Sequence, residues 1–381
     1  MDRLILTGAR IFDGSKLRHG ALILDHGQIA DIAETPPAEG RRIRLPGGTL
    51  APGLLDLQVN GGGGTMLDGA TTADTIARVC AAHAATGTTG LMPTLISDSA
   101  AATRSVLAAG IAAAARVPGF LGLHLEGPHL DPTRPGCHPH EAIRPLAEDD
   151  IETLCEAKTG LPALIVTLAP AAAAPAQIAR LVGAGIIVSL GHANCTLAEA
   201  EAAFAAGASM VTHLFNAMSP LGAREPGLVG AALTHPVACG LIADGVHVHP
   251  STIRAALAAK REGAVFLVSD AMAVAGTGLG EFTLAGRRIL RGDGALRLED
   301  GTLAGADLSL VQAVRYMIQT VGVAPETALA MASSLPARLI GAQVGRIAPG
   351  LPADLVHFDD DWKLTRVWRR GAPVQTNSSA E

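Results

Sequence analysis

The stretch from residue 163 to residue 192, ALIVTLAPAAAAPAQIARLVGAGIIVSLGH, contains the unit from which the fold can be predicted. Two short aliphatic runs, at 163–170 and 185–192, enclose an alanine-rich amphipathic segment. A strand, a helix and a second strand in this order form a parallel pair with the helix packed across it. The stretch therefore predicts one βαβ unit.

The same pattern repeats along the middle of the chain. Between about residues 51 and 335, short aliphatic runs alternate with alanine-rich segments of helical periodicity. The eight runs that we interpret as strands are 53–60, 88–95, 120–127, 163–170, 185–192, 209–215, 238–245 and 264–271. At this chain length, eight strands that alternate with helices favour a closed barrel over an open sheet. The sequence therefore predicts the α/β class and a (β/α)8 barrel of the TIM type.

The two ends of the chain have a different character. Residues 1–50 contain short alternating runs separated by glycine-containing turns, which is typical of a β-meander. Residues 336–381 contain similar runs, VGRIAPGLPADLVHFD and KLTRVWRRGAPVQ. We expect both ends to pair into one small β domain beside the barrel, with divisions at 1–50, 51–335 and 336–381.

Composition and charge argue against several classes of partner. Hydrophobic residues make up 49% of the chain and aromatic residues 3%, so the core must be largely aliphatic. The formal charge is -6 and no run of Lys or Arg exceeds a pair. Binding to nucleic acid or to an anionic membrane normally requires a basic patch. We therefore expect a small-molecule partner.

Cysteine usage and the N-terminal residues bear on the compartment. The sequence reaches Asp13 before a signal-length apolar region develops, and no stretch of 18 apolar residues occurs. We expect a soluble protein of the reducing cytoplasm, since the cysteines are scattered and form no C-x-x-C pair. The five cysteines are Cys80, Cys137, Cys155, Cys195 and Cys239.

Four polar side chains stand at the ends of predicted strands. Alternation along a strand places Glu126, His192 and His213 toward the barrel interior at the carboxyl ends, where the reactive groups of such barrels lie. One carboxylate and two histidines match the ligand set of a catalytic zinc whose fourth position is open. A buried carboxylate also needs such a partner. Asp270 ends the eighth strand and is then left as an acid/base.

Each of these residues has a simpler interpretation when taken alone. A single histidine at a strand end is more often a hydrogen-bonded core residue than a ligand. Asp270 precedes Ala-Met and would also suit the cap of a following helix. The coincidence of four such groups at four strand ends favours the metal site.

A second group of residues is compatible with an anion pocket. Asn216 follows the sixth strand, Arg224 lies in the loop GAREPGLVG, and His247 follows the seventh strand. Guanidinium groups and helix N-termini favour phosphate. A surface arginine and a solvated histidine are an equally good interpretation.

The run NGGGG at 60–64 lacks dinucleotide-binding spacing and is interpreted as a turn that brings backbone close to a ligand. The residues interpreted as bystanders are His83, His129, His140, His235 and, from the pattern alone, Cys137.

Six motifs together resemble a known family. From the N-terminal side onward, the motifs are HLEGPHL, GHANCT, THLFNAM, GAREPGLVG, ADGVHVHP and VSDAM. In this order they resemble the N-acetylglucosamine-6-phosphate deacetylases of the amidohydrolase superfamily, over nearly the whole chain. The resemblance implies a (β/α)8 barrel with a small β-sandwich built from both termini. It also implies hydrolysis of the acetamide of an amino-sugar phosphate.

The resemblance implies roles for individual residues. It implies that Glu126, His192 and His213 bind the metal. It implies that Asp270 is the catalytic acid/base and that His138 hydrogen-bonds the acetyl carbonyl. The substrate-binding positions that it implies are Gln58, Cys137, Asn216, Ala217, Arg224, His247, Leu303, Ala304 and Gly305. It further implies a homodimer in which Arg224 reaches into the neighbouring active site.

The first and fourth strands depart from the wider superfamily. Gln58 and Asn60 occupy the positions usually held by an H-x-H pair, and the strand ALIVTLAP lacks a lysine that could be carbamylated to bridge two metals. We therefore expect one divalent ion per chain, zinc with iron(II) as the alternative.

Three alternatives follow from the same residues. The missing H-x-H pair and strand-four lysine argue against a deaminase or a cyclic-amide hydrolase. Asp270 and the complete ligand set argue against a catalytically silent sugar-phosphate-binding barrel. A deacetylase of another N-acetylhexosamine 6-phosphate, such as the galactosamine epimer, remains open.

Overall fold

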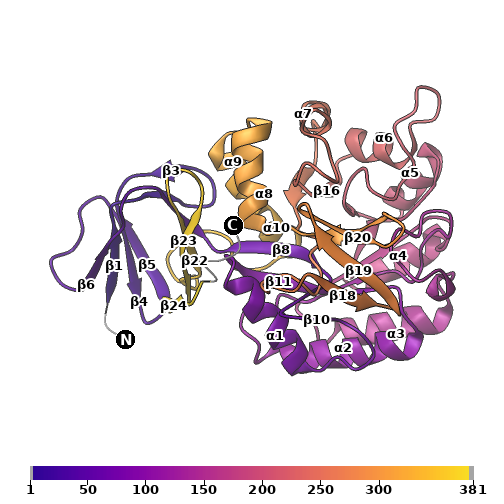
Figure 1. Cartoon of the computed structure of the whole chain (residues 1–381), viewed down its shortest axis with the longest axis horizontal. Coiled ribbons are helices and arrows are strands. Elements are labelled where there is room, and N and C mark those ends of the chain that lie inside the picture. The colour runs from indigo at the N-terminus through magenta and orange to yellow at the C-terminus, as the bar shows by residue number, and fades with distance from the viewer. Residues whose placement is uncertain (1–2, 377–381) are drawn as a thin grey trace.

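The largest sheet of the computed structural model, which describes residues 3–376, has eight parallel strands. Their sequential neighbours are hydrogen-bonded throughout, from the first strand to the eighth (Figure 1). Seven fall within the predicted runs and β11 extends one residue beyond its run, which confirms the (β/α)8 barrel. The strands are β8 (Leu54–Val59), β11 (Thr88–Ile96), β12 (Leu123–Glu126), β13 (Leu164–Leu168), β14 (Ile187–Leu190), β15 (Met210–Val211), β16 (Ala238–Leu241) and β17 (Ala264–Leu267).

Helices connect the strands and cover the outside of the barrel (Figure 1). Local sequence explains where several of them begin. Ser99 accepts a hydrogen bond from a backbone N–H of the helix that follows it, and Pro175 and Pro250 occupy first-turn positions that need no donor. The helices are α1 (Ala73–Ala84), α2 (Ala100–Ala114), α3 (Glu148–Lys158), α4 (Pro175–Gly183), α5 (Leu197–Ala205), α6 (Gly227–Thr234), α7 (Pro250–Ala259), α8 (Leu310–Tyr316), α9 (Pro325–Met331) and α10 (Ser334–Leu339), with a π-helical turn at Met317–Val321.

The barrel closes where β8 meets the segment that follows β17. The backbone N–H of Asp270 donates to the carbonyl of Gln58 at 3.1 Å, and that of Asn60 donates to the carbonyl of Ala271 at 2.8 Å. The buried carboxyl of Asp56 accepts the backbone N–H of Ser269, and burial raises its pKa to about 7. Closure therefore places the end of the first strand beside Asp270.

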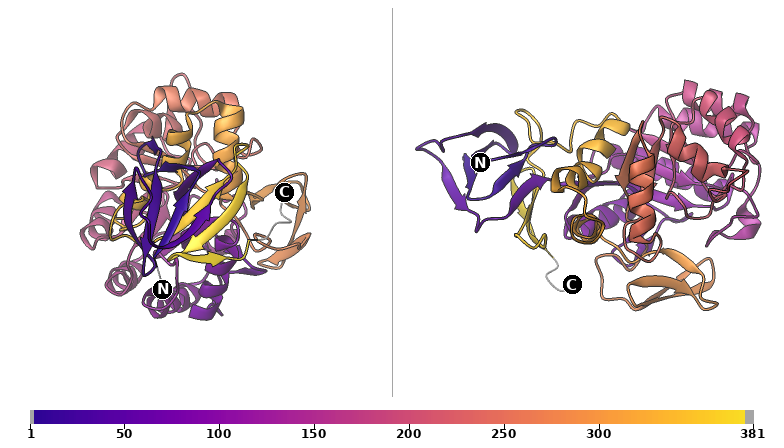
Figure 2. Two further views of the ribbon diagram at one scale, coloured as in Figure 1. Left: turned by 90° about the vertical axis from the view of Figure 1, so that its left-hand side faces the viewer. Right: turned by 90° about the horizontal axis from the view of Figure 1, so that it is seen from above.

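A second body of two mixed sheets is built from both chain ends. Strand β7 (Thr49–Pro52) pairs antiparallel with β22 (Leu355–Phe358), so residues some 300 positions apart lie side by side. Figure 2 shows the indigo and yellow strands together at one end of the molecule. This confirms the predicted terminal β domain. Its other strands are β1 (Leu4–Thr7), β2 (Arg10–Phe12), β3 (Leu17–Arg18), β4 (Ala21–Asp25), β5 (Gln28–Ala33), β6 (Arg41–Arg44), β23 (Leu364–Arg369) and β24 (Ala372–Val374). The outer ends of the two terminal segments, residues 1–2 and 377–381, lie outside the described residues.

A four-stranded antiparallel sheet is inserted after the last barrel strand, and the sequence reasoning missed it. It consists of β18 (Glu281–Leu284), β19 (Arg287–Gly292), β20 (Ala295–Leu298) and β21 (Leu303–Ala306). Side chains from all four strands pack in a small core against Ile96 and Met272 at the barrel mouth. Alternating residues separated by the glycine turns AGR, RGDG and EDGT were the available signal. A two-stranded hairpin, β9 (Gly61–Gly62) with β10 (Thr65–Met66), confirms the turn predicted at NGGGG.

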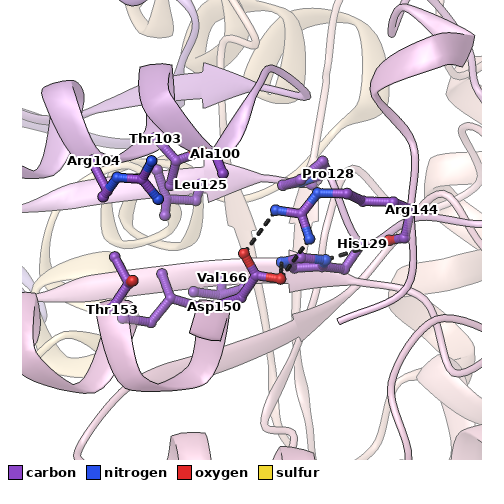
Figure 3. Close-up of a pocket in the computed structure, with 12 residues that line it drawn as sticks. Ala100, Thr103, Arg104, Leu125, Pro128, His129, Arg144, Asp150, Thr153 and Val166 are labelled. Carbon is purple, nitrogen blue, oxygen red and sulfur yellow. Dashed lines mark hydrogen bonds and ion pairs between the residues drawn. The ribbon is translucent and has the colours of Figure 1, made fainter. Parts of the chain in front are cut away.

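The long segment after β12 is fastened to the outside of the barrel. Arg144 donates two hydrogen bonds to the carboxylate of Asp150 at the start of α3, one of them at 2.7 Å. The backbone N–H of Arg144 donates to the carbonyl of Pro128 at 3.0 Å, and the Nδ1 atom of His129 lies 3.3 Å from the carbonyl of Arg144 (Figure 3). These contacts hold both ends of the segment that carries His138, which includes a 3-10 turn at His140–Ala142.

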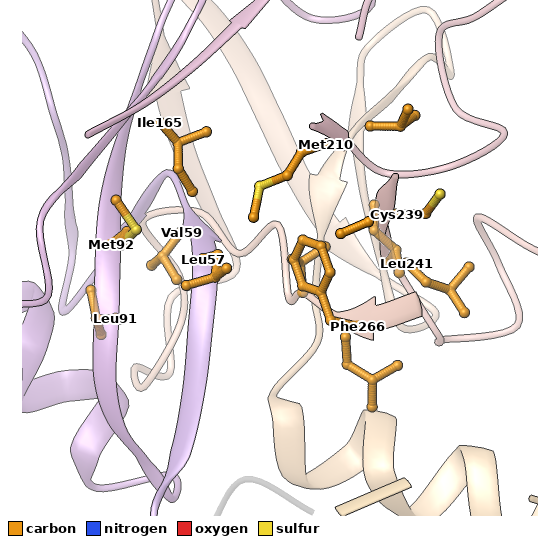
Figure 4. Close-up of a cluster of buried hydrophobic side chains, with 14 of the residues drawn as sticks. Leu57, Val59, Leu91, Met92, Ile165, Met210, Cys239, Leu241 and Phe266 are labelled. Carbon is orange, nitrogen blue, oxygen red and sulfur yellow. The ribbon is translucent and has the colours of Figure 1, made fainter. Parts of the chain in front are cut away.

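The barrel core is aliphatic, as the composition predicts. Leu57, Val59, Ile165 and Leu241 are at most 2% exposed, and Phe266 is one of the few aromatic rings among them (Figure 4). Within the described residues, no helix has the length and apolar character needed to cross a lipid bilayer.

Candidate metal and acid–base site

Glu126, His192 and His213 converge at the carboxyl end of the barrel. Glu126 is the last residue of β12, and the two histidines each lie two residues beyond their strands. The Nε2 atoms of the histidines are 3.0 Å apart, and they lie 3.4 Å (His192) and 3.0 Å (His213) from Oε1 of Glu126. Among residues 3–376, these three form the one group of at least three His, Cys, Asp or Glu side chains able to share an ion.

The backbone is unusual at three of the strand ends. His192, His213 and Asp270 have φ values of 46°, 29° and 52°. Residues other than glycine rarely adopt such left-handed conformations, and these conformations cluster at functional sites. The turns therefore direct three polar side chains inward at some cost in backbone strain.

The ring of His192 is held in the form that a metal ligand requires. Its Nδ1 atom lies 2.9 Å from the carbonyl oxygen of Arg134, which can only accept a hydrogen bond. Nδ1 must therefore carry the proton, which leaves the lone pair on Nε2 facing Glu126 and His213.

The charges of the cluster also suit a cation. Burial by itself would raise the pKa of Glu126, but the hydrogen bonds and charge of the two histidines outweigh burial and hold that pKa well below its usual value. Burial would lower the pKa of His213, yet its hydrogen bond with Glu126 raises it. Nδ1 of His213 is buried without a hydrogen-bond partner in the described part of the chain. An ionised carboxylate faced by two imidazole Nε2 atoms, which bind a metal once they are deprotonated, is a donor set that fits a divalent ion.

Asp270 lies next to this cluster and is held by two amides. Nε2 of Gln58 donates to Oδ1 of Asp270 at 3.1 Å and to Oε1 of Glu126 at 2.9 Å, while Nδ2 of Asn60 donates to the same Oδ1 at 2.7 Å. Burial and the charge of Glu126 raise the pKa of Asp270 to about 6. Because both amides use Oδ1, Oδ2 is the oxygen left to accept a proton.

His138 reaches the cluster from the loop after β12. Its Nε2 atom is 3.9 Å from Oε2 of Glu126, and its ring packs edge-on against His192. The backbone N–H of Ser97 donates to Nδ1 of His138 at 3.1 Å, so Nδ1 carries the lone pair and Nε2 carries the proton. Burial and the charge of His192 lower the pKa of His138 to about 3. His138 is therefore a neutral ring with an N–H donor directed at the cluster.

The other predicted substrate positions lie around the mouth. Asn216 donates to the carbonyl of His213 at 3.3 Å, and the carbonyl of Ala217 accepts the backbone N–H of Ala193. Strand β21, which contains Leu303, Ala304 and Gly305, lies against the Asp270 segment, since the N–H of Ala306 donates to the carbonyl of Asp270 at 3.0 Å.

Two further predicted positions contact neighbours of the cluster. The carbonyl of Cys137 accepts a hydrogen bond from Arg287 of the inserted sheet. Nδ1 of His247 lies 2.6 Å from Oδ2 of Asp244. Arg224 is exposed, and the structure does not bring it into the cluster.

Three residues of this site were missed as functional residues. Asn60 was noted only as a departure from the superfamily, and Ser97 and Asp244 were not considered. Ser97 and Asp244 both follow aliphatic strands at their carboxyl ends, so the rule that found Glu126 and Asp270 also applies to them.

Comparison with known proteins agrees with this geometry. Residues 49–377 match the amidohydrolase family. The chain belongs to that family. The resemblance inferred from the six motifs is thus confirmed at the family level, and so is the hydrolase class with a site able to hold a metal.

Individual amidohydrolases are similar over almost the full chain. One is N-acetylgalactosamine-6-phosphate deacetylase of Shewanella sp. (strain ANA-3), 40% identical, with 97% of this chain and 95% of the relative covered. Another is the human N-acetylglucosamine-6-phosphate deacetylase, 36% identical with the same coverage. The crystal structure of N-acetylglucosamine-6-phosphate deacetylase from Pasteurella multocida superposes with a TM-score of 0.93 at 32% identity, covering 97% of this chain and 99% of that one.

Proposed function

We propose that this chain hydrolyses the acetamide of N-acetyl-D-glucosamine 6-phosphate to D-glucosamine 6-phosphate and acetate, in the breakdown or recycling of amino sugars. The observation that carries the proposal is the placement of an acid/base, Asp270, and a neutral N–H donor, His138, on a buried three-ligand cluster. Acyl-transfer chemistry needs these components in one place. The full-length similarity to deacetylases of amino-sugar phosphates supports the substrate class.

Glu126, His192 and His213 would hold one divalent ion, zinc with iron(II) as the alternative. Such an ion supplies Lewis-acid chemistry by lowering the pKa of water and polarising a carbonyl group.

His138 supplies the hydrogen bond to the acetyl oxygen. Because its Nδ1 accepts the Ser97 backbone N–H, Nε2–H is fixed as a donor and does not lose its proton to the cluster. A donor fixed in this way stabilises the negative charge that develops on the carbonyl oxygen during attack.

Asp270 moves the proton. Its Oδ2 atom takes the proton from the attacking water and returns it to the leaving amine, while Gln58 and Asn60 hold Oδ1. The pKa of about 6 leaves the carboxylate ionised at neutral pH and still basic enough for this exchange.

Asn216, His247 and Arg224 bind the sugar phosphate in this proposal, with Arg224 supplied by the second subunit of a homodimer. Arg224 is exposed and has no ion-pair partner within residues 3–376, and Leu221 in the same loop is 60% exposed. A charged group and an apolar side chain on one exposed loop support a contact with a second copy. We place the reaction in the cytoplasm, which the five unpaired thiols support.

A second candidate substrate is the galactosamine epimer. The relative that is 40% identical is an N-acetylgalactosamine-6-phosphate deacetylase, and the two epimers share the acetamide and the phosphate. Acetate release from both N-acetylhexosamine 6-phosphates, each with and without the phosphate, tests the proposal. We expect the phosphorylated sugars to exceed the free sugars in kcat/KM by about 2–5 kcal/mol of transition-state binding. No acetate from any of the four would contradict the proposal.

A further inference from the structure

Asp244 and His247 form a largely buried acid–imidazole pair beside the proposed site. Oδ2 of Asp244 lies 2.6 Å from Nδ1 of His247, and each side chain is 6% exposed. Oδ1 of Asp244 accepts the backbone N–H groups of Val246 and His247, both at 2.8 Å. One carboxylate therefore fixes both the loop and the ring that the loop carries.

The pair sits at the mouth of the barrel. Asp244 lies three residues beyond the end of β16, the strand between those that lead to His213 and Asp270. Gly245, with φ of 78°, packs on the ring of Tyr316, and a Cβ there would come within 2.6 Å of the tyrosine hydroxyl. The turn is thus closely packed against Tyr316, and Asp244 holds both its backbone and the ring of His247.

The contact determines what the other ring nitrogen can do. A carboxylate can only accept here, so Nδ1 of His247 carries a proton, and Nε2 has no hydrogen-bond partner among the described residues. In a neutral ring of this tautomer, Nε2 bears a lone pair that repels an anion. When the ring is charged, Nε2–H becomes a charge-assisted donor for an anionic oxygen.

The contact with the ring also acts on the carboxylate. Burial would raise the pKa of Asp244, but the hydrogen bond and charge of His247 outweigh burial and lower it.

We propose that Asp244 is a positioning residue for the phosphate of the substrate, which it serves by holding His247 as a charged ring with Nε2–H directed at the phosphate. The inference rests on the proposed function, because it assumes an anionic substrate group at His247.

The sign of the effect makes the inference testable. A carboxylate near an anion site repels the anion, so its removal should improve phosphate binding if Asp244 were a bystander. If Asp244 acts through His247, its removal weakens binding instead. The two interpretations therefore predict opposite changes in KM.

The experiment compares wild type, Asp244→Asn, His247→Gln and the double variant on N-acetylglucosamine with and without the 6-phosphate. For Asp244→Asn we expect KM for the phosphorylated sugar to rise about tenfold or more, with kcat nearly unchanged and kcat/KM for the free sugar unaltered. The double variant should be no worse than His247→Gln alone. Glu141→Gln, which removes an exposed carboxylate elsewhere at the mouth, is the matched control and should not raise KM.

An unchanged or lower KM in Asp244→Asn, or additive losses in the double variant, would overturn the inference. If Asp244→Asn does not fold, Asp244→Ser keeps an acceptor for the backbone N–H groups and carries the same expectation. Equal wild-type rates on the two sugars would instead overturn the phosphate part of the proposed function, and this inference with it, so the two failures are distinguishable.

Discussion

Nδ2 of Asn60 donates a hydrogen bond to Oδ1 of Asp270 at 2.7 Å, across the seam where the first barrel strand meets the segment after the last. The two residues are 210 positions apart in the chain. The contact thus ties the end of the first strand to the carboxylate of Asp270.

This contact predicts a pH effect. Burial and the charge of Glu126 raise the pKa of Asp270 to about 6, while the Asn60 hydrogen bond lowers it. Asp270 must be ionised to accept a proton, and a cation held by Glu126 would offset one of the causes that raise its pKa. The acidic limb of kcat/KM in wild type should therefore lie at or below about pH 6.

The Asn60→Ala variant should move that limb to higher pH, because one cause that lowers the pKa of Asp270 is lost. The measurement is kcat/KM from pH 4.5 to 9, with metal content determined in parallel. A limb that stays in place while the rate falls uniformly would show that Asn60 has only a structural role.

Asp270→Asn should abolish most of the turnover. Asparagine keeps the size of the side chain and can still accept the Gln58 and Asn60 hydrogen bonds, but it cannot take a proton. We expect kcat to fall by about 100- to 10,000-fold while the metal content stays near that of wild type. Retention of more than a tenth of the wild-type kcat would require another base.

The metal content should be about one divalent ion per chain. Glu126→Gln removes the only carboxylate of the ligand group and should release the ion. Chelation of the wild-type protein should lower its Tm, because an ion bound only by the folded state stabilises that state. Elemental analysis and thermal melts with and without added zinc measure both effects. Two tightly held ions per chain would contradict the single site.

Ser97 fixes the ring of His138 through its backbone N–H, so Ser97→Ala should lower kcat only slightly. The backbone N–H that fixes the ring remains in the variant, and only the hydroxyl contact at 2.8 Å is lost. We expect a loss of less than about tenfold in kcat, against about 100- to 1,000-fold for His138→Ala, which removes the donor itself. Equal losses in the two variants would mean that the hydroxyl, rather than the backbone, sets the tautomer.

Arg224 should act in the neighbouring subunit. Mixing Arg224→Ala with Asp270→Asn under conditions that exchange subunits should create one site per mixed dimer with both residues intact. Activity should then rise above that of either parent variant. The result that refutes a shared site is no gain after subunit exchange has been demonstrated, since each site would then still carry one defect.

The sequence by itself determined the barrel and predicted the three side chains that the structure brings together at its mouth. Strand runs such as 163–170 are short, aliphatic and separated by helical segments, and local periodicity alone reveals such elements. Glu126, His192 and His213 were found because strand ends in a parallel barrel must share one rim. Pairing of the two chain ends was also predictable. Both ends carry short alternating runs, and neither end alone is long enough to bury the apolar face of the strands that these runs form.

Only the tertiary structure decided how Glu126, Asp270 and His138 are held. The Gln58 contact with Glu126 and the Asn60 contact with Asp270 join residues 68 and 210 positions apart, so no local pattern contains them. Ser97 acts on His138 through a backbone N–H, which every residue except proline carries and which therefore leaves no mark in the sequence. The orientation of each polar side chain depends on which donors and acceptors the closed barrel places within hydrogen-bonding distance, and those distances exist only after the chain has folded.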